Sequence, residues 1–266
     1  MLSQGIISGQ VKFPGVYPVK KGEHISSLVD RAGGFTDKAY PRGAIFTRES
    51  ARVIQQQRLD ELTNQIESSM LSSAEKGASV AFDEATTKAQ QATLASQKEL
   101  LSKLRVTKVE GRVVIKLAEA EQFKDSKYDI ELEKGDKLFV PEMPGIISVV
   151  GEVYNPTSLM YEKNRTVAYY LQKVGGPTRE ADKKYISVVK ADGSVVSIAQ
   201  NNPDSVYWDN EEHQWNFGGF MGIRLNPGDT IIVPRKVDQF LWLQTTKDLT
   251  TILFQAALAA GVIIAL

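Results

Sequence analysis

The chain repeats itself at a constant offset of 142 residues. A first block begins at Gly9-Gln10-Val11 and ends at Gly33-Gly34, and a second begins at Gly151-Glu152-Val153 and ends at Gly175-Gly176. The step from 9 to 151 equals the step from 33 to 175, so no residue is gained or lost inside the block. With 266 residues in all, the repeat predicts two similar domains.

A shorter signature, LxxGDxxxVP, follows each block at residues 132–141 and 225–234. Here the offset is only 93 residues (225 − 132). The first copy therefore carries 49 more residues between its two signatures (142 − 93). This arithmetic predicts a tandem repeat with an insertion in the first copy.

Each copy is predicted to form a hairpin, a short helix and further strands. In the first copy, short β-prone runs flank the turn at Pro14-Gly15. Apolar residues at helical spacing then precede each Gly-Gly pair, which is expected to end the helix. They are Ile25, Leu28, Val29 and Ala32 in the first copy and Val167, Tyr170, Leu171 and Val174 in the second. The LxxGDxxxVP segment predicts a tight turn followed by an edge strand that Pro ends.

These elements predict an α+β protein with two tandem β-grasp domains, in which one helix lies across a small mixed sheet. We expect the first domain at residues 1–145, with an inserted helical hairpin at about 49–105. The second domain is expected at 146–237 and an amphipathic or transmembrane C-terminal helix at 238–266.

The insertion has the composition of solvent-exposed helices. One apolar face is predicted from Leu59, Leu62, Ile66 and Met70, and a weaker second face from Leu94, Leu101 and Leu104. Residues 72–79 lack this periodicity and would form the tip of an antiparallel hairpin that projects from the first domain. Such a hairpin could dock a partner or be a solvated spacer.

The second copy has a shorter excursion of its own that is dense in aromatic residues. It includes Trp208, Trp215, Phe217 and Phe220. These rings could stack on pyranose faces of a glycan, or they could cover a small core or a subunit interface. We favour the second interpretation.

Residues 243–266 form an apolar stretch in which no charged residue follows Asp248. As a helix the stretch would reach ~36 Å, enough to cross a hydrocarbon core of ~30 Å. Gln244, Asp248, Thr251 and Gln255 would then lie in one narrow polar stripe, with Trp242 placed as an interfacial anchor. The stretch could be a single membrane anchor, a member of a ring of helices whose stripe lines an aqueous pore, or a helix folded back on the soluble domains.

Composition argues against several functional classes. The 32 basic and 32 acidic residues cancel, so no net field attracts nucleic acid. The chain has no Cys, and its two histidines, His24 and His213, lack a metal-ligand partner at i+3 or i+4. No phosphate loop, dinucleotide fingerprint or nucleophile elbow occurs. We therefore expect neither an enzyme nor a metal or cofactor site.

The motif order GxVxxP, GG, LxxGDxxxVP, present twice, resembles the SLBB domain, a soluble-ligand-binding β-grasp module. The stretches at residues 48–62, 111–115 and 150–156 are similar to bacterial outer-membrane polysaccharide export proteins. This resemblance implies a periplasmic homo-oligomeric ring of stacked β-grasp domains. It also implies that the C-terminal helix contributes to an α-helical barrel in the outer membrane.

The resemblance further implies a non-enzymatic translocon for capsular or exopolysaccharide. Its polar stripe would face the polymer in transit, and its apolar circumference would face outer-membrane lipid. An inner-membrane polysaccharide co-polymerase would be a partner of the helical insertion. A soluble-ligand or glycan-binding module and a membrane-anchored structural adaptor are the alternatives. No signal peptide, export-signature domain or lipidated Cys precedes the repeat in this sequence, which fits either a fragment of the family's usual architecture or a divergent subfamily.

Overall fold

The computed structural model describes residues 3–78, 95, 98, 101–117, 123–124, 126–200, 207–209, 214–216 and 218–236. Packing divides the described chain into two compact units. One unit contains both five-stranded sheets apart from Arg112 of the first sheet, and the other runs from Arg48 to Arg112.

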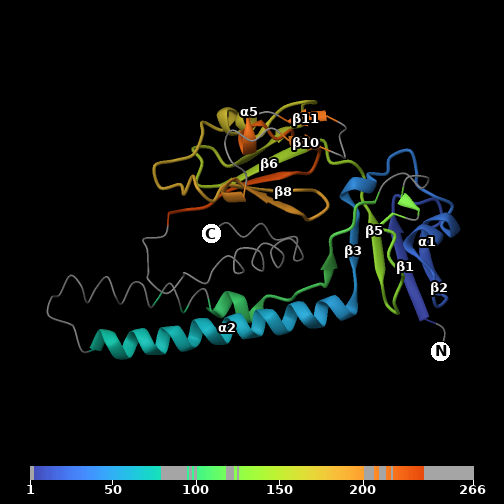
Figure 1. Ribbon diagram of the computed structural model, residues 1–266, viewed down its shortest axis with the longest axis horizontal. Helices are drawn as coiled ribbons and strands as arrows, with labels where there is room; N and C mark the ends of the chain where they lie inside the picture. The colour runs from blue at the N-terminus through green and yellow to red at the C-terminus, as the bar shows by residue number, and fades with distance from the viewer. Residues whose placement is uncertain are drawn as a thin grey trace. The chain divides into compact units, whose positions relative to one another are not determined.

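The first sheet has the strand order β2-β1-β5-β3-β4 (Figure 1). Its strands are β1 (Ser3–Gly9), β2 (Gly15–Val19), β3 (Ile45–Thr47), β4 (Arg112–Val113) and β5 (Lys137–Val140). β1 and β5 run parallel, whereas the β1–β2 and β3–β5 pairs are antiparallel. The helix α1 (Ile25–Arg31) covers one face of this mixed sheet.

The second sheet repeats this arrangement with the order β7-β6-β12-β8-β9. Its strands are β6 (Ile146–Gly151), β7 (Thr157–Met160), β8 (Ser187–Val189), β9 (Val195–Ser197) and β12 (Thr230–Val233), and its helix is α5 (Val167–Lys173). β6 and β12 are parallel, as β1 and β5 are. The predicted pair of mixed sheets, each with one helix, is therefore confirmed.

Shorter elements complete the described chain. A two-stranded ribbon consists of β10 (Tyr207–Asp209) and β11 (Gln214–Asn216). Short 3-10 helices are η1 (Pro41–Gly43), η2 (Ile198–Gln200) and η3 (Gly219–Gly222).

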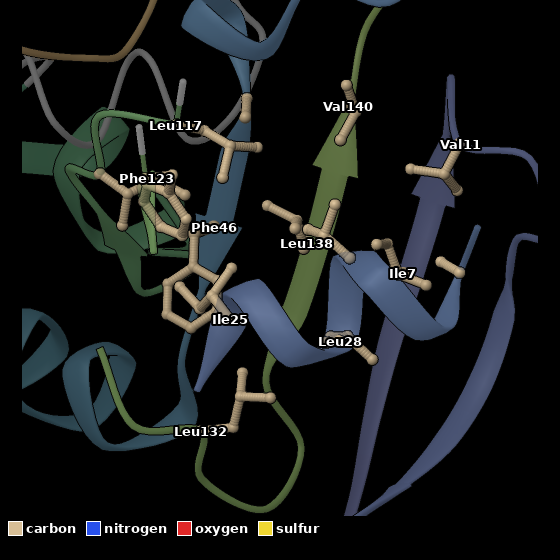
Figure 2. Packing of buried hydrophobic residues seen from close by; sticks show 14 of the residues in the cluster. Ile7, Val11, Ile25, Leu28, Phe46, Leu117, Phe123, Leu132, Leu138 and Val140 are labelled. Atoms are coloured by element: carbon tan, nitrogen blue, oxygen red, sulfur yellow. The ribbon is translucent and has the colours of Figure 1, made fainter. Parts of the chain in front are cut away.

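The helical periodicity in each copy marks the core, as predicted. In the first domain Ile25 and Leu28 point from α1 toward Leu138 of β5 and Ile7 of β1 (Figure 2). All four predicted positions of this helix are at most 2% exposed, and the four of the second copy at most 4%. Burial of these stripes fixes each helix on its sheet.

The prediction of an edge strand after each LxxGD turn was wrong. β5 and β12 are the central strands of their sheets. Pro141 is compatible with this position because it follows the last residue of β5, Val140, and need not donate to the ladder. Its carbonyl instead accepts a hydrogen bond from the Tyr40 amide at 2.8 Å.

The predicted turn itself is confirmed. Gly135 and Gly228 have φ values of +87° and +83°. The buried carboxylate of Asp136 accepts the Glu133 amide at 2.7 Å, and that of Asp229 accepts the Asn226 amide at 2.9 Å. In each copy the Gly-Asp pair thus supplies the left-handed residue and the acceptor that close the turn.

The insertion is built on a long helix, α2 (Glu49–Ala78), so the prediction that residues 72–79 form the tip of the hairpin was wrong for residues 72–78, which continue the helix. Its predicted apolar face is buried together with residues of the return segment, and this separate core comprises Leu59, Leu62, Ile66, Met70, Leu101, Leu104 and Val109. Arg105 also pairs with Glu67 at 2.9 Å. These contacts agree with an antiparallel pairing of α2 and the return segment, whereas Leu94 lies outside the described residues.

The offset between the repeats gave only a net difference of 49 residues, whereas the structure shows which connections differ in length. Residues 48–111 connect β3 to β4, whereas residues 190–194 connect β8 to β9 in the second copy. The second copy has its own longer connection between β9 and β12, which contains the β10–β11 ribbon. The two excursions partly cancel in the offset.

Within the described ranges, no helix combines the length and the hydropathy needed to cross a bilayer. The helix expected at 238–266 lies outside these ranges, as do Trp242, Gln244, Asp248, Thr251 and Gln255.

Candidate functional site

The buried carboxylates of the described residues hold the fold together. Asp129 accepts the amide of Ser26 at 2.9 Å and its hydroxyl at 2.7 Å, and so fixes the start of α1. Among the residues that the structure describes, no cluster of three or more His, Asp or Glu side chains could hold a metal ion. These groups therefore do not assemble a metal centre in that part of the chain.

Asp229 is the most deeply buried carboxylate of the second domain. Its oxygens accept Lys190 Nζ at 3.0 Å and the amides of Asn226 and Ala191 at 2.9 and 3.0 Å. Burial raises the pKa of Asp229, while the Lys190 ammonium opposes that rise. Asn226 belongs to the same turn as Asp229, and Lys190 and Ala191 belong to the β8–β9 connection, so Asp229 joins two turns of the fold and the pair is structural.

Phe220 does not form part of a glycan platform. Its side chain is 1% exposed and packs in the second core, which agrees with the favoured interpretation that these rings cover a small core. Trp208 and Trp215 are register partners in the β10–β11 ribbon, while Phe217 lies outside the described residues. Of these four aromatic residues, Phe220 is thus explained by packing in the core.

The structure instead exposes apolar side chains on the first sheet, on the face away from α1. Val16 is 59% and Phe139 is 43% exposed. Their register partners, Ile6 and Ile45, share this face because directly paired residues point the same way. Two apolar pairs, Val16 with Ile6 and Phe139 with Ile45, therefore lie on the face of the first sheet away from α1.

The second sheet also has exposed apolar residues on the face away from its helix. Ile146 of β6 and Met160 of β7 are register partners and are 40% and 73% exposed. Next to them, the hydroxyls of Ser148 and Ser158 are hydrogen-bonded at 3.0 Å. Strand alternation predicts such a face, but sequence alone cannot show which side of a sheet its helix covers.

One exposed aromatic residue follows the GxV motif in each copy. Phe13 and Tyr154 are 63% and 66% exposed. They pack against Gly33 and Gly175, where an added Cβ would approach the Phe13 ring to 2.7 Å and Tyr154 Cβ to 3.1 Å. Neither residue was predicted as a surface feature, although both lie one or two residues after the repeated Val.

These features define a class of protein. Two copies of a small β-grasp fold, with buried polar groups used structurally and apolar side chains exposed on their sheets, are typical of a binding or assembly module.

Comparison with known proteins specifies this class. Residues 7–55 and 146–199 match the SLBB domain. Two proteins of Escherichia coli, each named polysialic acid transport protein KpsD, are 29% identical to the chain over 185 residues. That alignment covers 69% of this chain and 27% of each relative, so the chain spans about a quarter of their length. The chain thus carries two stretches that match the SLBB domain, as its repeated motifs predicted, and it is similar to polysaccharide transport proteins.

Proposed function

We propose that the chain is a non-enzymatic component of a bacterial polysaccharide export apparatus and assembles with copies of itself into a ring. The observation that carries this proposal is the tandem pair of SLBB matches in a chain that is similar to proteins named for polysialic acid transport. Capsular or exopolysaccharide would be the transported polymer. The periplasm would hold the two domains, and the outer membrane would hold the C-terminal residues.

The proposed channel uses the polar stripe of the C-terminal stretch. Gln244, Asp248, Thr251 and Gln255 would face water in the pore, with Trp242 at the membrane interface. A hydrated polymer needs weak polar contacts along its path, and a carboxylate or amide facing lipid would be costly. Domain boundaries at 1–145, 146–237 and 238–266 belong to the same proposal.

Cysteine accessibility tests the stripe, since the natural chain has no Cys. Thr251→Cys and Gln255→Cys in the assembled protein should react with a membrane-impermeant thiol reagent. Leu253→Cys, on the opposite side of the helical wheel, is the matched control and should be protected. Equal protection at all three positions would contradict a water-filled pore. Electron micrographs of the detergent-purified protein should separately show rings with a central hole.

The helical insertion is the proposed docking element for an inner-membrane polysaccharide co-polymerase. α2 is 30 residues long, and a helix of that length extends about 45 Å. Its core uses one face only, which leaves the other face for a partner or for solvent. Removal of the hairpin distinguishes these roles.

Glycan binding without a channel is a second candidate, supported by the exposed rings of Phe13 and Tyr154. Aromatic faces of this kind pack on pyranose rings. Saturable binding of an oligosaccharide to the monomer, weakened by Tyr154→Ala and by Phe13→Ala, would favour this candidate. Tyr185→Ala, at another exposed aromatic, is the control.

A further inference from the structure

The edge strand β2 of the first domain is protected against strand addition. Successive residues of an edge strand alternately direct their backbone groups inward and outward. Pro18 is the register partner of Gln4 in β1. The Gln4 carbonyl accepts a hydrogen bond from the Gly135 amide on the other side of β1. The backbone groups of Pro18 therefore point away from β1, toward the open edge. Pro18 has no N–H, and its carbonyl accepts Arg31 Nη1 at 2.8 Å. The missing N–H and the occupied carbonyl of Pro18 both prevent a further strand from pairing with β2.

The equivalent edge strand of the second domain, β7, has neither a proline at this position nor an arginine bonded to its carbonyl. Met160 occupies the position of Pro18, 142 residues later. Its register partner Ile146 bonds Gly228 on the other side of β6, so the backbone of Met160 also points outward. Lys173, at the position of Arg31, lies over the Tyr169 ring at 5.4 Å from the ring centroid. Met160 therefore presents an N–H and a C=O at the edge, and its side chain is 73% exposed.

The second domain also carries a β-ribbon that the described part of the first domain lacks. β10 and β11 pair over three residues each, from Tyr207 opposite Asn216 to Asp209 opposite Gln214. In the described chain they form a sheet of their own, with no third strand. A lone two-stranded ribbon is marginally stable in water and gains from a further strand.

We propose that the β10–β11 ribbon of one copy adds to the β7 edge of the next copy. The inference rests on the self-assembly in the proposed function and names the surfaces that join. The ribbon and the open edge occur in the same domain, and both are missing from the described part of the other domain. The two surfaces differ from each other, so the contact is head-to-tail and can repeat around a ring. Met160 and Ile146 would be partly covered by the added strand.

Replacing Met160 with the residue found at position 18 tests the edge. Met160→Pro removes the outward N–H, and Met160→Val, which keeps it, is the matched control. In the full chain we expect Met160→Pro to raise the dissociation constant of the assembly by at least about tenfold. Met160→Val should assemble as the natural chain does. Size-exclusion chromatography with light scattering gives the assembly, and circular dichroism checks the fold.

Disulfide trapping tests the same contact without proline. A Ser158→Cys chain is mixed with chains that carry one cysteine in the ribbon, at Tyr207, Trp208, Gln214 or Trp215. A cross-linked heterodimer from at least one mixture supports the proposal. A single chain that carries both cysteines is tested in parallel. If a cross-link forms only within such a chain, the ribbon pairs with β7 of its own chain and the proposal is overturned. Absence of any cross-link, or full assembly of folded Met160→Pro, would also overturn it.

Complementation of a strain that lacks the protein separates this inference from the proposed function. If cross-links form but the natural chain does not restore surface polysaccharide, the export role fails and the contact stands. If export is restored and folded Met160→Pro assembles and exports normally, the contact fails and the export role stands.

Discussion

Two buried carboxylates of the described residues, Asp136 and Asp229, lie in the turns that lead into β5 and β12. Asp229 has a fully buried side chain, whereas its partner Lys190 is 19% exposed. Such a pair contributes little net stability compared with apolar residues, but removing one member leaves an unpaired charge and several unsatisfied donors.

We therefore predict that Asp229→Ala lowers the free energy of unfolding by about 3–5 kcal/mol. The change removes the carboxylate that accepts from the Lys190 ammonium and from the Asn226 and Ala191 amides. Urea unfolding followed by circular dichroism measures the loss. Arg58→Ala is the control, because its pair with Glu61 is exposed on both sides and should change little. Equal losses of unfolding free energy in the two variants would contradict a larger contribution from the buried carboxylate of Asp229.

A second residue, Glu23, should make stability depend on pH. Burial acts to raise the pKa of Glu23, but hydrogen bonds from the Lys20 amide, Arg31 and Ser27 hold it below its ordinary value. A lowered pKa means that the folded state binds the proton less readily than the unfolded state. Its contribution is thus present above the unfolded pKa and is lost as pH falls through the folded value.

Glu23→Gln should accordingly be less stable than the natural protein near neutral pH. The difference should shrink below pH 4.5, the ordinary value for Glu. Thermal unfolding of both proteins from pH 7 to pH 3 measures it, with Glu110→Gln as the control at an exposed site. A difference that stays constant over this range would contradict the role given to the ionised form.

At the scale of elements, each repeat depends on a glycine where its first strand ends. Gly151 has φ of +91°, and a Cβ there would lie 2.1 Å from the backbone oxygen of Val233. Gly9 has the same relation to Val140. The close approach of the two parallel strands leaves no space for a side chain, which explains the repeated Gly of the GxV motif.

Gly151→Ala is expected to destabilise the second domain by about 3 kcal/mol or more, from backbone strain and the clash together. Gly176→Ala is a sharper control than a random site, because Gly176 has φ of +81° but open space around its Cβ position. It should cost about 1 kcal/mol from strain alone. Similar midpoints in urea for the two variants would show that the clash is relieved by a shift of β12.

These elements also show what the sequence could predict. The repeat, the two helices and the core of α2 followed from periodicity, because burial of one helix face leaves a strong local signal. The central position of β5 and β12 did not follow, because strand order depends on pairing between distant segments. The sequence left Phe220 between a glycan contact and a core role for a related reason, because composition marks an aromatic residue but only packing decides whether it lies in a core or on a surface.

At the scale of the whole molecule, the two copies share a framework and differ in what they carry. The first copy holds a helical hairpin between β3 and β4, and the second holds a ribbon between β9 and β12. Neither excursion contributes to the strand order, which is the same in both sheets. We infer that the framework provides stability and that the excursions provide contacts with other molecules.

This separation predicts that the hairpin can be removed without loss of the fold. The ends of the excursion lie together, since the Arg48 amide donates to the Gly111 carbonyl at 2.9 Å. The second copy makes the equivalent connection with residues 190–194. Replacement of residues 50–108 with a short Gly-Ser linker should therefore leave both sheets folded. Hydrogen exchange should show protected amides in β1, β5, β6 and β12, as in the full chain.

The same deletion tests the docking role. If the hairpin binds an inner-membrane partner, the shortened protein should still form rings but should lose most surface polysaccharide in a complementation assay. A version with Val53→Ser and Ile54→Ser, exposed residues on α2, is the matched control for a local contact and should show a partial loss. Normal export by the shortened protein would contradict the docking role, because export would then not require any partner that binds the hairpin. The hairpin would in that case be a spacer.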